Sequence, residues 1–165
     1  MKEQIACIIL SRLLKKHNAL NQWKRVVVNY KYEKPYFPSK PLHSQIYSLM
    51  YGFDTKLSNK IMREVCYLVN MQIIKNIKAF LIMNEDIAQK ALNNIKYHRA
   101  DFKGTICDYI DVRFQQYTKV APVSLIRPSS TFVLAFSYMS SQEGAYYWYN
   151  VAKQIEMYVS EKVKI

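Results

Sequence analysis

The sequence predicts an α+β fold in one domain, residues 1–165, with about five or six helices and a small two-stranded β element. A chain of 165 residues, half of them apolar, is long enough for a single domain with a buried core. Only three glycines and five prolines interrupt it, which favours helices over long loops. Apolar residues recur mainly at helical spacing, and two short segments have the composition of strands.

The first forty residues predict a helix followed by a strand. Residues 3–22 form an amphipathic pattern, because isoleucine and leucine recur near helical spacing while lysines face away. Three consecutive valines then open the segment 26–32, in which Tyr30 and Tyr32 alternate with polar residues. This period of two is typical of a strand. Three prolines between 35 and 41 are predicted to stop the strand and hold an extended connection.

The rest of the chain predicts further helices and one more strand. A short helix over 43–51 should end at Gly52, and the helix over 56–83 should be central because its apolar face is broad. The segment 131–138 is apolar at both odd and even positions, which predicts a buried strand paired with 26–32. Other helices are predicted from 84–86 to about 97, over 105–119 and over 141–162.

Positive charge is concentrated at the start of the chain. The net charge is +12, of which residues 1–40 carry +7, residues 41–100 carry +4 and residues 101–165 carry +1. A basic front half is the pattern expected of a protein that binds nucleic acid or another polyanion. A lysine-rich surface that serves only solubility would produce the same counts, and both interpretations stay open.

Cations and aromatic rings interleave over residues 12–40. Lysines there could neutralise phosphates while the rings stack on unpaired bases, so this surface is predicted to contact nucleic acid. The alternative is that the tyrosines pack on the core and the lysines are only solvated. The predicted nucleic-acid-binding residues are Arg12, Lys15, Lys16, Trp23, Lys24, Arg25, Lys31, Lys34, Tyr36 and Lys40.

Residues 136–150 contain a short motif. Ser140 and Glu143 have the spacing of a capping box, which predicts a sharp turn into the last helix. The run F-x-Y-x-x-S-x-E-G-x-x-Y-W, Phe136 to Trp148, resembles a strand-to-helix motif of small, poorly characterised bacteriophage proteins. Gln142 departs from the proline often found there. The resemblance implies an origin in a phage or related mobile element, and it implies no catalytic role.

The tyrosines after this motif suggest a second function. Tyr146, Tyr147 and Tyr149 could form an aromatic platform that stacks on bases or anchors a protein partner. The protein would then be a virion component or an inhibitor of a host enzyme. The structural alternative is a capped helix whose first turn is packed by its own rings.

The sequence favours a non-enzymatic protein that needs no cofactor and no metal. It contains no nucleophile elbow, P-loop, dinucleotide fingerprint or HExxH motif, and its three cysteines are far apart. One catalytic alternative remains, a nuclease whose Mg²⁺ is held by acids of one region. Those acids are Asp101, Asp108 and Asp111, with Glu85 or Asp86.

The sequence also predicts a cytoplasmic protein, inside a host cell. The apolar run at 5–10 is interrupted too early by Arg12 and two lysines to form the core of a signal peptide. No stretch of about 18 uncharged apolar residues is present, so no membrane span is predicted.

Overall fold

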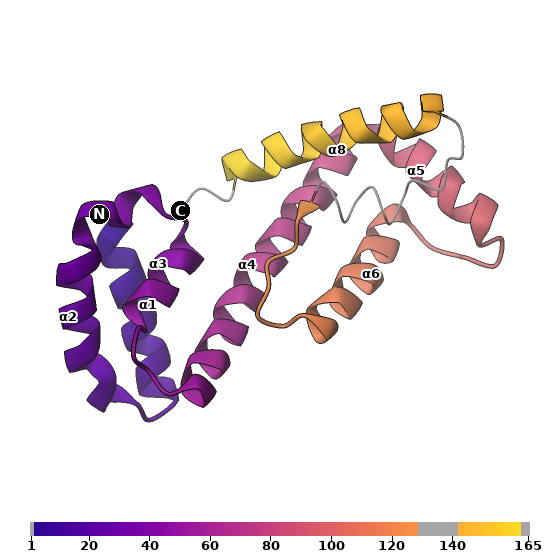
Figure 1. Cartoon of the computed structure of the whole chain (residues 1–165). Coiled ribbons are helices and arrows are strands. Elements are labelled where there is room, and N and C mark those ends of the chain that lie inside the picture. The colour runs from indigo at the N-terminus through magenta and orange to yellow at the C-terminus, as the bar shows by residue number, and fades with distance from the viewer. Residues whose placement is uncertain (1, 129–141, 163–165) are drawn as a thin grey trace. The chain divides into compact units, whose positions relative to one another are not determined.

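The computed structural model describes residues 2–128 and 142–162, and every regular element within them is a helix (Figure 1). The chain divides into two compact units, which we call the N-terminal unit, residues 1–68, and the C-terminal unit, residues 69–164. Helix α4, Thr55–Met83, contributes its first part to the N-terminal unit and its second part to the C-terminal unit.

The N-terminal unit has a mainly aliphatic interior. It comprises α1 (Lys2–Lys16), the short 3₁₀ helix η1 (Leu20–Gln22), α2 (Trp23–Glu33), the 3₁₀ helix η2 (Lys34–Ser39), α3 (Leu42–Leu49) and the start of α4. Both α1 and α2 contact α3 (Figure 1). The side chains that are fully buried here include Leu10, Leu14, Val26, Phe37, Ile46 and Leu49.

Helix α1 ends at Lys16, six residues before the predicted end at 22. Asn18 adopts a left-handed conformation with a φ of 54°. The Ala19 amide donates to the Leu14 carbonyl at 2.7 Å, and the Asn18 amide donates to the Lys15 carbonyl at 3.2 Å. This pair of bonds is a Schellman motif, in which asparagine tolerates the left-handed position that glycine usually fills. The chain therefore turns early enough for a second helix to begin at Trp23.

The predicted strand over 26–32 is wrong, because these residues lie within helix α2. Val26 is buried, and Tyr30, four residues later, packs edge-on against Phe37 with ring centroids 5.4 Å apart. A buried row at helical spacing outweighs the strand preference of valine, since that preference depends on context. The other predicted strand, 131–138, lies outside the described residues. The α+β assignment is therefore corrected to an all-helical one for the described chain.

The proline-rich connection is also more regular than predicted. Residues 34–39 form η2, with a proline in its first turn and Pro38 inside it, and only Lys40 and Pro41 are extended. Proline is compatible with the first turn of a helix because the amide that it lacks has no partner there.

The C-terminal unit contains the second part of α4 together with α5 (Glu85–His98), α6 (Ile106–Val120) and α8 (Gln142–Lys162). The helices predicted over 43–51, 56–83, 105–119 and 141–162 are confirmed to within two residues. The second part of α4, together with α5, α6 and α8, contributes to one core cluster. Its fully or almost fully buried members include Ile74, Ile77, Phe80, Ile95, Ile110, Phe114, Trp148, Val151 and Ile155.

A buried asparagine fixes the loop after α6. Asn70 is fully buried on α4; its Nδ2 donates to the Ser124 carbonyl at 3.0 Å, and its Oδ1 accepts from the Ile126 amide at 2.8 Å. Buried backbone groups need such partners, since leaving one unsatisfied costs about 1–3 kcal/mol. The segment 121–127 is thereby held against α4 without regular structure of its own.

Helix α4 is long and apolar enough to cross a membrane by length and composition alone. Half of the 18-residue window that meets this criterion is buried inside the structure. The core helix of a soluble protein meets the same criterion, so this property does not distinguish the two environments.

Candidate nucleic-acid interface

The exposed face of α2 combines cations with apolar side chains. Residues three, four and seven apart share a helix face, and here that face carries no acid. The one acid of α2, Glu33, is half-buried. Tyr32 is 85% exposed and Val28 is 64% exposed. The exposed residues of the helix are Lys24, Arg25, Val27, Val28, Lys31 and Tyr32.

Two further predicted residues continue this surface into η2. Lys34 and Tyr36 are both exposed, whereas Trp23, at the start of α2, is half-buried. We call the set Lys24, Arg25, Val28, Lys31, Tyr32, Lys34 and Tyr36 the basic α2 surface. Among the described residues no ion pair involves any of its four cations.

Two of the predicted cations are paired with acids instead. Lys16 Nζ lies 3.1 Å from a Glu64 carboxylate oxygen, and His17 Nε2 lies 2.8 Å from the other. Partial burial would raise the pKa of Glu64, but the hydrogen bonds and positive charges of Lys16 and His17 outweigh it and hold that pKa below its usual value. Lys40 Nζ lies 2.8 Å from Glu33. These two lysines therefore contribute less free positive charge than the sequence predicted.

Arg12 and Lys15, the remaining predicted cations, are exposed on α1. The ten predicted nucleic-acid-binding residues thus separate into three groups. One group lies on α2 and η2, a second is exposed on α1, and Lys16 and Lys40 form the third, paired group. The interleaving of cations and rings in the sequence is realised mainly on α2 and η2.

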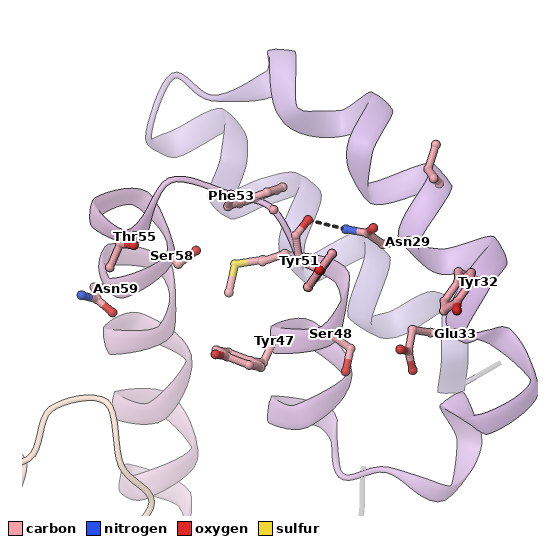
Figure 2. Close-up of a pocket in the computed structure, with 13 residues that line it drawn as sticks. Asn29, Tyr32, Glu33, Tyr47, Ser48, Tyr51, Phe53, Thr55, Ser58 and Asn59 are labelled. Atoms are coloured by element: carbon pink, nitrogen blue, oxygen red, sulfur yellow. Dashed lines mark hydrogen bonds between the residues drawn. The ribbon is translucent and has the colours of Figure 1, made fainter.

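A hollow of about 670 Å³ opens beside α2 (Figure 2), and we call it the tyrosine hollow. It is formed by α2, α3, the turn between α3 and α4, and the first turns of α4. Three exposed tyrosines, Tyr32, Tyr47 and Tyr51, line it. The other lining residues are Val28, Asn29, Glu33, Ser48, Met50, Gly52, Phe53, Thr55, Ser58 and Asn59.

Asn29 holds the wall of the tyrosine hollow together. Its Nδ2 donates to the Leu49 carbonyl at 2.8 Å and to the Tyr51 carbonyl at 2.9 Å, the second of which is drawn in Figure 2. The last carbonyls of a helix have no partner within that helix, and here a side chain of α2 supplies one for the end of α3. The spacing between α2 and the turn is therefore fixed by a specific pair of hydrogen bonds.

The backbone conformation of the same turn favours a glycine. Gly52 has a φ of +85°, a conformation that other residues adopt only with strain. A Cβ at this position would also collide with the guanidinium of Arg25. The missing side chain leaves room for the Arg25 side chain to lie against Gly52, which itself lines the tyrosine hollow.

A second, more polar hollow adjoins the first. It measures about 520 Å³ and shares Val28 and Asn29 with the tyrosine hollow. We call it the amide–cation hollow, because the residues that line it apart from Val28 are Asn21, Gln22, Lys24, Arg25 and Asn29. Side-chain amides and cations are donors that suit phosphate oxygens.

The three tyrosines of the predicted aromatic platform differ in exposure and in contacts. Tyr147 is half-buried beside the core, edge-on to the buried Trp148, and Lys90 Nζ lies 4.6 Å from its ring centroid. Tyr146 and Tyr149 are 68% and 52% exposed on α8. Phe136 and the predicted capping serine of the motif lie outside the described residues.

Two acids of the nuclease alternative, Asp108 and Asp111, have structural partners. Asp108 forms a capping box with Thr105 at the start of α6, and the hydrogen bonds from Thr105 lower its pKa. Asp111 Oδ1 lies 2.9 Å from Lys78 Nζ. Within residues 2–128 and 142–162, no three His, Cys, Asp or Glu side chains are placed to hold a metal ion.

No protein-family model, no curated protein and no solved structure matches this chain. The interpretation of these surfaces therefore depends on the geometry and chemistry of this chain alone.

The tyrosine hollow was not predicted from the sequence. One local signal was available, since Tyr47 and Tyr51 lie four residues apart at the end of a predicted helix, immediately before Gly52. The part played by Asn29 had no such signal, because residues 26–32 were predicted to form a strand. Its contact with the end of α3 exists only once α2 is a helix.

Proposed function

We propose that the N-terminal unit binds nucleic acid through the basic α2 surface. The observation that carries this proposal is the exposed face of α2 and η2, where four cations without an ion pair among the described residues lie beside exposed rings and no acid. Cations of this kind bind phosphates and release condensed counterions, while exposed rings can stack on bases.

The distribution of charge between the two units supports the same proposal. Residues 1–68 contain twelve basic and four acidic residues, a net charge of +8, whereas residues 69–164 contain twelve and eight, a net charge of +4. Of the four acids in the N-terminal unit, Glu33 and Glu64 are paired with lysines. A polyanion would therefore be attracted more strongly to the N-terminal unit.

We further infer that the protein acts by binding rather than by catalysis, as an accessory protein of a phage or mobile element inside its host cell. The partners of Asp108 and Asp111 support a binding role, because both carboxylates already stabilise the fold. The origin in a phage is suggested by the motif at 136–148 and by the abundance of isoleucine, lysine, asparagine and tyrosine, whose codons are rich in A and T.

Binding of the full chain to labelled DNA and RNA, followed by fluorescence anisotropy at about 50 and 200 mM salt, tests the proposal. We expect affinity to fall steeply with salt. The triple variant K24Q/K31Q/K34Q removes three cations of the basic α2 surface. It should reduce the magnitude of the slope of log affinity against log salt concentration by about 2.

A matched variant, K96Q/K103Q/K119Q, removes the same charge from exposed positions of the C-terminal unit. We expect it to bind nearly as well as the unchanged chain. Equal losses in the two variants would mean that only net charge matters and that no defined surface exists. No binding at about 50 mM salt would overturn the proposal.

A second candidate function is supported by the exposed face of α8. Tyr146 and Tyr149 are neighbours on that face, and Met157, which is 70% exposed, follows more than two turns later on the same helix. Aromatic and methionine side chains are enriched in protein interfaces, so this face would suit a protein partner. A complex recovered from host-cell lysate that survives nuclease treatment and is lost in Y146L/Y149L would favour this function over nucleic-acid binding.

A further inference from the structure

Two adjoining hollows on α2 differ in chemistry. The amide–cation hollow presents Lys24, Arg25 and the amide side chains of Asn21 and Gln22. The tyrosine hollow presents three aromatic rings. A phosphate group suits the first hollow and a planar base suits the second.

We propose that the two hollows together hold one nucleotide of a single-stranded nucleic acid. Its phosphate lies against Lys24 and Arg25, and its unstacked base lies against Tyr47 and Tyr51. This inference rests on the proposed function and narrows it from nucleic acid in general to a single strand.

The size and lining of the tyrosine hollow fit a base. Its volume of about 670 Å³ lies within the range of about 300–1,000 Å³ that small-molecule sites commonly have. Tyr47 and Tyr51 are 65% and 79% exposed, so their rings are accessible without any change of the fold. The exposed amide of Asn59 and the hydroxyl of Ser58 can bond to the edge of a base (Figure 2).

The electrostatics of the hollow do not oppose an anion. Glu33 is the only acid among the residues that line it. Its carboxylate accepts a hydrogen bond of 2.8 Å from Lys40, whose Nζ also donates to Ser48 Oγ at 3.1 Å. The negative charge is therefore compensated at the wall, while the Arg25 side chain lies against Gly52, one of the lining residues.

The preference for a single strand follows from access to the bases. In a duplex each base is paired and stacked, so a tyrosine ring cannot reach its face unless the base is extruded. Unpaired bases offer that face freely, and stacking on tyrosine is tolerant of sequence. We therefore expect binding with little preference for particular bases.

The test compares a labelled single strand of about 15 nucleotides with a duplex of the same sequence, bound to the full chain. The variant Y47L/Y51L keeps apolar side chains but removes both rings. The matched control is Y67L/Y97L, which removes two exposed rings from α4 and α5 to which no binding role is assigned. We expect Y47L/Y51L to lose about tenfold or more in affinity for the single strand, with the duplex little changed and the control unaffected.

A second measurement locates the base directly. A single strand that carries 5-iodouracil is crosslinked to the unchanged chain by light, and the modified residues are identified by mass spectrometry. We expect adducts on Tyr47, Tyr51 or Tyr32.

Each outcome bears on one of the two proposals. If binding depends on salt and on K24Q/K31Q/K34Q but not on Y47L/Y51L, or if the duplex binds better, the single-strand inference is overturned and the proposed function stands. If neither nucleic acid binds, the proposed function is overturned as well. Far-UV circular dichroism of each variant shows whether its helices are intact.

Discussion

The N-terminal and C-terminal units use the same kinds of residue in opposite ways. Each contains twelve basic residues, but the C-terminal unit balances them with twice as many acids. In the described part of the C-terminal unit, four aromatic side chains are buried in the core, namely Phe80, Tyr109, Phe114 and Trp148. Among the aromatic side chains described in the N-terminal unit, only Phe37 is buried, and most of the tyrosines lie at the surface.

This difference separates rings that stabilise the fold from rings that are accessible to solvent. Buried rings in the C-terminal unit exclude water and contribute to folding, since large side chains dominate core energetics. Exposed rings in the N-terminal unit contribute little to folding and remain available for a ligand. Tyrosine itself follows this division only in part, because Tyr97, Tyr146 and Tyr149 of the C-terminal unit are also exposed, and Tyr109 is the one buried tyrosine among the described residues.

The largest expected effect contrasts a core ring with a surface ring. Phe114→Ala should lower the free energy of unfolding by about 3–5 kcal/mol, because Phe114 is buried in the core cluster. Tyr51→Ala should change it by no more than about 0.5 kcal/mol, because its side chain is 79% exposed. Urea denaturation followed by circular dichroism measures both. Similar losses in the two variants would contradict the division of roles.

A smaller effect contrasts two asparagines that tie a helix to a neighbouring segment. Asn70→Ala leaves the buried amide of Ile126 without its partner and should cost about 2–3 kcal/mol. Asn29→Ala removes two bonds at a partly exposed site and should cost about 1 kcal/mol. The same denaturation experiment ranks them, and the reverse order would show that the α2–α3 contact is the more important one.

The Asn29 variant also sharpens the comparison, since it should weaken nucleic-acid binding although it leaves every cation in place. Without Asn29, the turn that carries Tyr51 and Gly52 loses its link to α2. Asn70→Ala serves as the control, because it is less stable but leaves both hollows intact. If the less stable variant, Asn70→Ala, also binds nucleic acid more weakly than Asn29→Ala, the loss of affinity follows stability and this reasoning is contradicted.

The sequence alone predicted the long helices well, because their apolar periodicity extends over several turns. It failed at Val26–Val28, because a short run of β-branched residues is compatible with either a strand or a helix. The burial of Val26, which only the fold reveals, decides for the helix. The error changed the predicted site too. On a strand Tyr30 and Tyr32 would share a face, whereas on α2 Tyr30 packs inward and Tyr32 points outward.

The hollows could not be predicted from sequence because they depend on segments that meet only in the folded unit. Tyr32, Tyr47 and Asn59 come from three different helices. The pairing of Lys16 with Glu64, 48 residues away, could not be predicted from the sequence either. Charge counts therefore predicted which unit is the more basic, but not which of its cations lie in ion pairs.

The smallest expected effect is a pH dependence of stability near neutral pH that arises from the N-terminal unit. Burial lowers the pKa of His43 on α3, because the half-buried ring disfavours the charged form. As the pH falls below about 6.5, the unfolded chain takes up a proton that the folded chain resists, so the free energy of unfolding decreases. His43→Gln should remove this decrease between about pH 7.5 and 5.5 in urea denaturation. The pKa of Glu64 is instead lowered in the folded chain, so its contribution is lost only at more acidic pH and persists in that variant. A decrease that is unchanged in His43→Gln would place the responsible group elsewhere in the chain and remove this difference between the two units.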